Sequence, residues 1–263
     1  MPTPHELSAF LSDLMPRLGA IAKDGYENPG PVEWKERGQP VTAIDRRIET
    51  LAREAIHQAW PGHAIQGEEH GSTPGNAPTT WYIDPIDGTM NFARGLPFFS
   101  VSIGAWRHDR MIAGSVLDPL RNEHFHAAAG LGAHLNERPL QLKPGRVLRD
   151  ANVSLQTSAG SRYLKTPGFM PALQRRVAKT RRMGSIALEM AYVAAGRMDL
   201  VVGGRSKPQD WWDIAGAWAV LEESGGAVLD LSGKNLSPDS SHLVAGEPGL
   251  AREFIDWFES HPA

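Results

Sequence analysis

The 263-residue chain contains no cysteine. Disulfide frameworks, thiolate zinc sites and cysteine-nucleophile phosphatases are therefore excluded, and we expect a reducing or redox-indifferent compartment. No stretch approaches the roughly 20 apolar residues that a membrane-spanning helix needs, and the N-terminus lacks the basic and apolar regions of a signal peptide. From these absences we expect a soluble, cytoplasmic protein without a membrane partner.

An excess of positive charge is also missing. Lys and Arg number 27 against 30 Asp and Glu, which gives a formal net charge of −3. Binding of nucleic acid by phosphate neutralisation is therefore disfavoured, and we expect no nucleic-acid partner. The length suffices for a large hydrophobic core, either in one domain or in two halves packed together.

One run, WYIDPIDGTMNF at residues 81–92, concentrates acidic and turn-forming residues. Its aromatic and apolar start predicts the end of a buried strand, and Pro85 and Gly88 predict a turn where that strand stops. Asp84 and Asp87 would then lie at the strand end, where buried carboxylates need a counter-charge. A divalent metal ion bound by oxygen ligands would supply that charge.

The residues after the two carboxylates suit an anion or a water molecule. Gly88 and Thr89 offer backbone N–H groups and a hydroxyl. Taken alone, Asp84 before Pro85 is equally consistent with a solvated turn. An EF-hand loop is excluded because Pro85 and Ile83 stand where acids or amides are needed. An aspartyl-nucleophile phosphatase would carry an Asp at the position of Pro85, so a phospho-aspartate mechanism is disfavoured.

The first part of the chain reads as helices followed by antiparallel strands. Apolar residues recur at helical spacing over residues 5–24, where Pro16 would kink or divide the helix. Residues 25–40 read as a mobile connection rich in Gly and Pro. Thr42 and Asp45 form a capping-box pattern, and on this pattern alone Asp45 is more simply a cap. A meander is expected downstream, with strands at 98–106, 111–117, 124–129 and 134–140.

Near residue 145 the pattern changes to alternating strand-like and helix-like segments. We therefore predict an N-terminal α+β half at residues 1–145 and a C-terminal α/β half at residues 146–263. Asp213 falls in the first turn of a predicted helix, and taken alone it is most simply a helix-dipole or cap acid. Glu68 lies in an acidic turn that is most simply solvated, although it could supply a further carboxylate to Asp84.

Together these motifs resemble those of the inositol monophosphatase family of Mg²⁺-dependent, lithium-sensitive phosphatases. The matching segments are GEE at 67–69, DPIDGTMNF at 84–92, WDIAG at 212–216 and ESGG at 223–226. Secondary matches are PVTAID at 40–45, PFFSVSI at 97–103 and DPLRNE at 118–123. Their order and gaps agree with the family over nearly the whole chain. The resemblance implies a layered αβαβα sandwich, commonly assembled as a homodimer.

The resemblance also implies a set of site residues and two or three Mg²⁺ ions. The implied metal ligands are Glu68, Asp84, the backbone carbonyl of Ile86, Asp87 and Asp213, with Asp84 bridging two ions. The implied catalytic residues are Glu68, Thr89 and Asp45, of which Thr89 and Asp45 would orient or deprotonate the attacking water. The implied contacts to phosphate and substrate are Asp87, Gly88, Thr89, Ser185 and Arg205.

The substrate is less well determined. Inositol-specific members of the family carry a glutamate shortly before the Trp-Asp motif, and the corresponding segment VVGGRSKPQ at 201–209 has none. Arg205 and Lys207 could contact a second phosphate or carboxylate, although an exposed basic loop is the simpler interpretation. We expect an inositol monophosphatase-like hydrolase of a small phosphorylated polyol or sugar. The alternative substrates are histidinol phosphate, fructose 1,6-bisphosphate and 3′-phosphoadenosine 5′-phosphate, and the non-enzymatic alternative is a Mg²⁺-dependent sensor.

Overall fold

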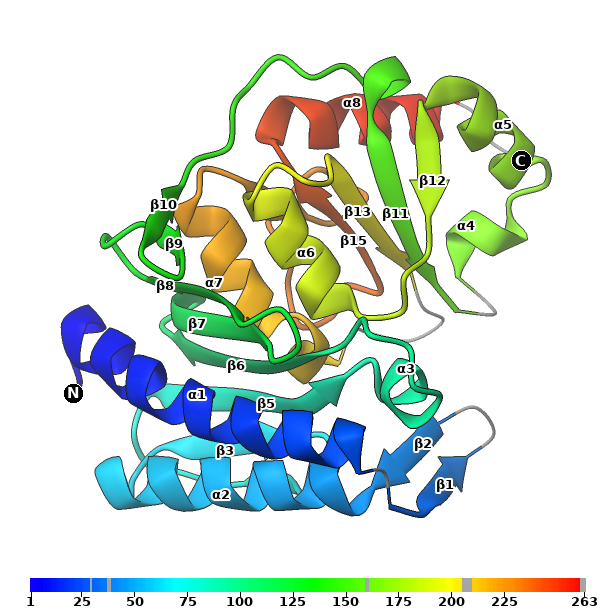
Figure 1. Cartoon of the computed structure of the whole chain (residues 1–263). Helices are drawn as coiled ribbons and strands as arrows, with labels where there is room; N and C mark the ends of the chain where they lie inside the picture. Colours follow the sequence, from blue (N-terminus) through cyan, green and yellow to red (C-terminus); the bar gives the residue numbers. More distant parts are fainter. Residues whose placement is uncertain (29, 37–38, 159–160, 205–209, 261–263) are drawn as a thin grey trace.

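The computed structural model describes all residues except 29, 37–38, 159–160, 205–209 and 261–263, with the side chains of 35–40 also left out. The chain forms a layered αβαβα sandwich, as the resemblance implies (Figure 1). Helices α1 (Pro4–Glu27) and α2 (Ala43–Ala59) cover one face of an eight-stranded sheet. Helices α6 (Ile186–Ala194) and α7 (Ala215–Glu223) lie between that sheet and a five-stranded sheet.

The first sheet has the order β10-β9-β8-β7-β6-β5-β3-β4 and is antiparallel except where β3 pairs with β5. Its strands are β3 (Ala64–Gly67), β4 (Gly71–Thr73), β5 (Thr79–Asp87), β6 (Ser100–Arg107), β7 (Arg110–Asp118), β8 (Glu123–Ala128), β9 (Ala133–Leu135) and β10 (Arg138–Leu140). The predicted meander is confirmed. The predicted strand 134–140 is instead the hairpin of β9 and β10, because Asn136 adopts a positive φ of 53° between them.

The second sheet has the order β12-β11-β13-β15-β14. Its strands are β11 (Asn152–Thr157), β12 (Lys179–Arg181), β13 (Leu200–Gly204), β14 (Ala227–Leu229) and β15 (His242–Gly246). Its outer face is covered by α4 (Arg162–Lys165), α5 (Phe169–Arg176) and α8 (Pro248–Glu259), with the 3₁₀ turn η1 (Leu148–Asp150) at its edge. The division at residue 145 stays a prediction, since α6 and α7 share one apolar core with strands of both sheets.

Two glycines allow α7 to approach the first sheet closely. A Cβ atom at Gly104 on β6 would overlap the backbone of Ala215, and one at Gly114 on β7 would overlap Gly216. Larger residues at either position would therefore push the start of α7 away from the sheet. This close approach matters because the 3₁₀ turn η2 (Trp211–Asp213) immediately precedes that helix.

Of the two outcomes expected for Pro16, division of the helix does not occur, because apolar side chains on both sides of it are buried against the sheet and offset the missing hydrogen bond. Two other sequence-based expectations are wrong. Residues 25–40 are not merely a connection, since they include most of a hairpin of β1 (Val32–Glu36) and β2 (Gln39–Thr42). Finally, β5 does not stop at Asp84 but continues to Asp87.

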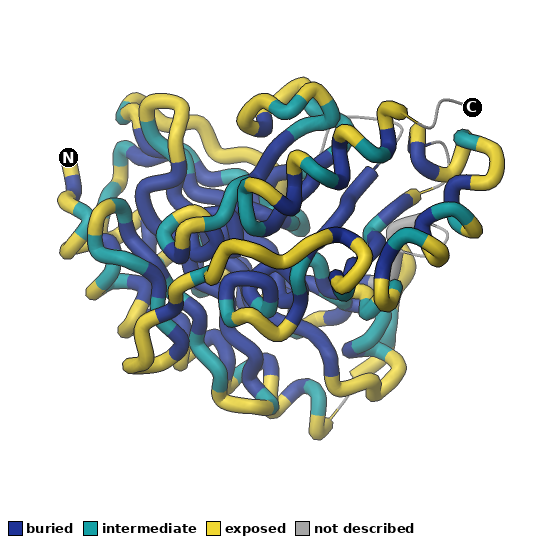
Figure 2. Tube along the Cα trace, turned by 90° about the horizontal axis from the view of Figure 1, so that it is seen from above, coloured by how far each residue is buried: buried dark blue, intermediate teal, exposed yellow. Residues whose placement is uncertain are grey.

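The buried apolar side chains form three clusters, one around the two-helix layer of α6 and α7, one between the first sheet and helices α1 and α2, and one under α8. Figure 2 shows buried chain, drawn dark blue, enclosed by exposed loops and helix faces. Among the described residues, no helix is both long and apolar enough to cross a membrane.

Candidate functional site

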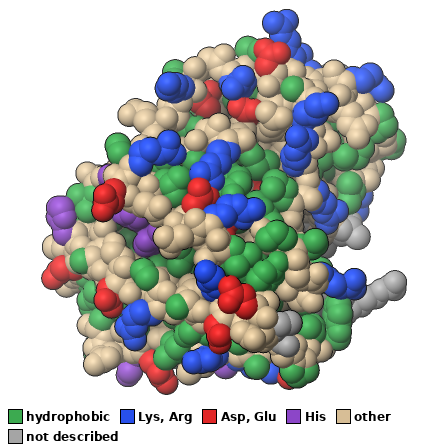
Figure 3. All heavy atoms as spheres, in the orientation of Figure 1, with side chains coloured by type: hydrophobic (Ala, Val, Ile, Leu, Met, Phe, Trp, Pro, Cys, Tyr) green, Lys and Arg blue, Asp and Glu red, His purple; other side chains and the backbone are tan. Residues whose placement is uncertain are grey.

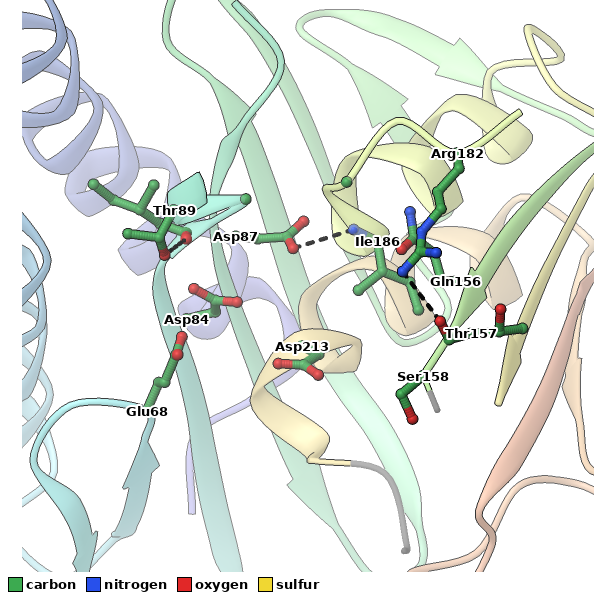
Figure 4. A pocket seen from close by; sticks show the side chains of 13 residues that line it. Glu68, Asp84, Asp87, Thr89, Gln156, Thr157, Ser158, Arg182, Ile186 and Asp213 are labelled. Carbon is green, nitrogen blue, oxygen red and sulfur yellow. Dashed lines mark hydrogen bonds between the residues drawn. The ribbon is translucent and has the colours of Figure 1, made fainter. Parts of the chain in front are cut away.

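A cavity of about 310 Å³ lies between the end of β5 in the first sheet and the end of β11 in the second (Figure 4). Its walls come from the β3–β4 turn, the end of β5, the end of β11, the β12–α6 connection and η2. The lining residues are Glu68, Asp84, Ile86, Asp87, Gly88, Thr89, Gln156, Thr157, Ser158, Arg182, Gly184, Ile186 and Asp213. Segments far apart in the sequence therefore meet at one polar cavity.

A β-bulge places both carboxylates of β5 on this cavity. Residues three apart in a regular strand point to opposite faces of the sheet. Asp84 pairs with Ser102 and Asp87 with Ser100, so β5 contains one residue more than β6 between these pairs. The extra residue brings Asp84 and Asp87 to the same cavity, and Pro85 is tolerated because a bulge leaves a residue unpaired.

The turn that carries Glu68 is fixed by hydrogen bonds to Glu49, which forms an ion pair with Arg53 on α2. Glu49 is fully buried and accepts hydrogen bonds from the backbone N–H groups of residues 69–70, at 2.7 and 3.1 Å. Arg53 donates to Glu49 at 2.7 Å. A Cβ atom at Gly67 would overlap the Glu49 carboxylate, so only glycine admits this contact. Glu49 and Arg53 thus fix the position from which Glu68 reaches the cavity.

Asp84 lies at the centre of a group of like charges. It is 2% exposed, and its Oδ1 accepts no hydrogen bond from any described residue. Burial raises the pKa of Asp84 well above its ordinary value, and the nearby carboxylates of Glu68, Asp87 and Asp213 raise it further. Figure 4 shows the side chains of Glu68 and Asp84 directed toward each other. Buried like charges of this kind need a counter-charge.

The donors at this wall fit Mg²⁺. They are carboxylate oxygens together with the backbone at Ile86, and hard oxygen donors are the ligands that Mg²⁺ prefers. Across the described chain, no three Asp, Glu or His side chains gather tightly enough to bind one ion together. Mg²⁺ does not require three, because it commonly binds through one or two carboxylates and keeps several waters. The orphaned Oδ1 of Asp84 is the atom that such an ion would satisfy.

Asp87, at the end of β5, is hydrogen-bonded to the start of α6. Its Oδ2 accepts hydrogen bonds from the Ser185 hydroxyl at 2.5 Å and from the Ala187 N–H at 2.7 Å, and its Oδ1 accepts from the Ile186 N–H at 3.1 Å. The carboxylate thereby caps α6, whose own N-cap residue makes no side-chain cap. Burial raises the pKa of Asp87 to about 7, against the opposing effect of these hydrogen bonds. Oδ1 retains the capacity to accept a second interaction.

Thr89 lies between two acceptors. Its hydroxyl oxygen is 2.9 Å from the Ile86 carbonyl oxygen and 3.4 Å from Asp45 Oδ1. Asp45 also caps α2, because its Oδ2 accepts from the N–H and hydroxyl of Thr42 at 2.9 and 2.5 Å. Burial raises the pKa of Asp45 to about 6. Asp45 therefore combines the cap that its motif predicts with a contact to Thr89.

Not every predicted site residue lines the cavity. Ser185 is fully buried and does not line the cavity. Its hydroxyl donates a hydrogen bond to Asp87, a carboxylate of the site. Asp45 lies behind Thr89. Arg205 and Lys207 fall outside the described residues, and their predicted contacts stay predictions.

Sequence reasoning missed the opposite wall, which contains Gln156, Thr157, Ser158 and Arg182. Among the described lining residues, Arg182 is the only cation. Gln156 and Ser158 belong to no motif, and the position of Arg182 shortly before Ser185 was the one available signal.

Residues 3–262 match the model of the inositol monophosphatase family. A protein named Nus factor SuhB from Pasteurella multocida is 36% identical over 249 residues, which cover 91% of each chain. An IMPase structure from Thermotoga maritima is 30% identical with a TM-score of 0.81 and 92% coverage of each chain. An inositol monophosphatase structure from Anabaena is 28% identical with a TM-score of 0.80 and 95% coverage of each chain.

Proposed function

Because the chain belongs to the inositol monophosphatase family, we propose that it hydrolyses the phosphate monoester of a small phosphorylated polyol or sugar in a Mg²⁺-dependent reaction. The observation that carries the proposal is Asp84, a buried carboxylate with an unsatisfied oxygen among other carboxylates. Bound Mg²⁺ would neutralise the phosphate and lower the pKa of a coordinated water. Glu68, Asp84, Asp213 and the carbonyl of Ile86, with Oδ1 of Asp87, are the proposed ligands.

Thr89 and Asp45 are proposed to orient the attacking water and to accept its proton. In hydrolysis the water oxygen bonds to phosphorus, the ester P–O bond breaks, the attacking water loses a proton, and the leaving alkoxide gains a proton from a second water molecule. The Thr89 hydroxyl can accept a hydrogen bond from this water while it donates to Asp45. Asp45 is the proposed final acceptor, since a carboxyl with a pKa of about 6 can take up a proton near neutral pH.

Phosphate oxygens would be bound beside the carboxylates. Gly88 has a φ of 95°, a conformation that favours glycine, and a Cβ there would approach the Gly184 carbonyl. This conformation ends β5 and leads into α3 (Thr89–Ala93), so the N–H groups of Gly88 and Thr89 are the proposed phosphate donors. Ser185 acts in this scheme by positioning Asp87 rather than by touching substrate.

The test is phosphate release, with and without Mg²⁺, from inositol 1-phosphate, histidinol phosphate, fructose 1,6-bisphosphate and 3′-phosphoadenosine 5′-phosphate. We expect Mg²⁺-dependent release from at least one compound and its loss in Asp213→Asn. The same chemical change at Asp109, in the surface turn between β6 and β7, is the control. Release that is independent of Mg²⁺, or that survives Asp213→Asn, would contradict the proposal.

The same experiment tests a non-catalytic role. The Pasteurella relative is named a Nus factor, and a Mg²⁺-dependent sensor would bind the ion without releasing phosphate from any compound. Calorimetry with Mg²⁺ beside the release assay separates the two outcomes. Lithium inhibition and a homodimeric assembly stay predictions from the family and can be measured on the same preparation.

A further inference from the structure

The cavity has two chemically different walls. One holds the four carboxylates of Glu68, Asp84, Asp87 and Asp213, and the other holds the amide and hydroxyl groups of Gln156, Thr157 and Ser158 together with the guanidinium of Arg182. Figure 4 shows Arg182 beside Gln156 and Thr157, on the side away from Glu68. A cavity of about 310 Å³ is at the small end for ligand sites, so a compact molecule would touch both walls.

A buried carboxylate organises the second wall. Glu189 on α6 is fully buried, and its Oε1 accepts the N–H groups of residues 183–184 at 2.7 and 3.2 Å. Its Oε2 accepts from the Ser154 hydroxyl and from the Gln156 amide N–H, each at 2.7 Å. Gln156 is therefore oriented with its NH₂ group toward Glu189. In the described chain its amide oxygen has no donor, which leaves it able to accept a hydrogen bond from a ligand hydroxyl.

Arg182 is held at this wall by a single backbone contact. The residue follows β12, which pairs in parallel with β11, and its Nη2 donates to the Thr157 carbonyl at 3.1 Å. It forms no ion pair within 4 Å with any carboxylate of the described chain. A guanidinium has five N–H donors in a planar fork, so most of its donors stay available. That fork matches a carboxylate or phosphate in a bidentate contact.

We propose that Arg182 is a specificity-determining residue, and that the preferred substrate is a phosphate monoester carrying a second anionic group, a carboxylate or a phosphate. This inference rests on the proposed function and names its substrate class. The scissile phosphate lies at the carboxylate wall, the second anion pairs with Arg182, and a hydroxyl between them donates to Gln156. A polyol phosphate without a second anionic group leaves the Arg182 guanidinium without an anionic partner.

The experiment uses two matched pairs of substrates with Mg²⁺. Fructose 1,6-bisphosphate and fructose 1-phosphate differ in a second phosphate, and 2-phosphoglycerate and glycerol 2-phosphate differ in a carboxylate, so the pairs identify the kind of anion. We expect kcat/KM of the wild type to favour the member with the second anionic group in at least one pair about tenfold or more, an effect typical of one charged hydrogen-bonding group.

The variants separate specificity from structure. Arg182→Ala should abolish the preference by raising KM for the substrate with the second anionic group far more than KM for its matched partner without that group. Arg182→Lys should restore part of it, because Lys keeps the charge and loses the bidentate geometry. Arg181→Ala is the matched control, since Arg181 is an exposed neighbour outside the cavity lining. An equal loss for both members of each pair, or no preference in the wild type, would overturn the inference.

Failure of the proposed function gives a different result. If no compound is hydrolysed, calorimetry with Mg²⁺ present compares the binding of fructose 1,6-bisphosphate and fructose 1-phosphate. Tighter binding of the bisphosphate, lost in Arg182→Ala, would support the Arg182 contact without hydrolysis. Equal binding of both sugars by the wild type would refute it.

Discussion

The two walls of the cavity are built in different ways. The carboxylate wall is supplied mainly by the bulge of β5 and the adjoining β3–β4 turn, and its side chains are buried or half-buried. The Arg182 wall is assembled from β11, the β12–α6 connection and α6, and its guanidinium is exposed. Figure 3 shows Lys and Arg side chains distributed over the part of the surface formed by the second sheet and its helices.

This difference separates chemistry from selectivity. Buried carboxylates tolerate little change, because each needs the same counter-charge and the same dry surroundings. An exposed arginine that donates a hydrogen bond to one backbone carbonyl can be replaced without unfolding the protein. We therefore expect substitutions at the first wall to abolish the reaction and substitutions at the second to change which substrate is preferred.

The largest effect is expected from Asp84→Asn. Loss of the central carboxylate should lower kcat/KM roughly 1,000-fold or more, as for removal of a key transition-state contact. The same change should raise the melting temperature of the Mg²⁺-free protein, because burial and neighbouring carboxylates destabilise the ionised Asp84. Mg²⁺ should then add little stability to the variant. Thermal unfolding of wild type and variant, with and without Mg²⁺, measures both changes. A lower melting temperature of the Mg²⁺-free variant than of the Mg²⁺-free wild type would contradict the electrostatic account.

A smaller effect is expected from Glu49→Gln, behind the first wall. Gln keeps the shape but loses the charge that holds Arg53 and the turn of Glu68, so Mg²⁺ affinity should fall about 10–100-fold, as for other residues behind metal ligands. Activity at saturating Mg²⁺ should largely recover. Glu54→Gln, an exposed change on the same helix, is the control. Unchanged Mg²⁺ dependence with only reduced stability would make Glu49 a purely structural residue.

The comparison of the walls also explains what could be predicted from the sequence. The carboxylate wall was predictable because Asp84, Ile86, Asp87 and Thr89 stand in one short motif. Even there, the bulge of β5 was missed, because the extra residue is defined by pairing with β6 and not by Pro85 alone. The roles assigned to these residues stay predictions until activity is measured.

The fold was predictable where the pattern of apolar residues is local, as in α2 and the meander from β6 to β8. Glu189 and Gln156 could not be assigned a role, because their contact joins α6 to β11 and no local pattern reports it. Burial of a glutamate inside an apolar helix is the one hint that the sequence contains. Tertiary contacts of this kind become visible only once the chain is folded.

The smallest of these effects is expected from Glu189→Gln, behind the second wall. This carboxylate accepts four hydrogen bonds, so a Gln NH₂ group would have to face at least one N–H or O–H. We expect a loss of about 1–3 kcal/mol of stability and, because Gln156 loses its orientation, a several-fold drop in the preference for substrates with a second anionic group. Glu222→Gln, which changes an exposed acceptor of the Trp218 N–H on α7, is the control. If Glu189→Gln lowers stability but keeps the full preference, Arg182 acts without Gln156, and the second wall is simpler than its hydrogen bonds indicate.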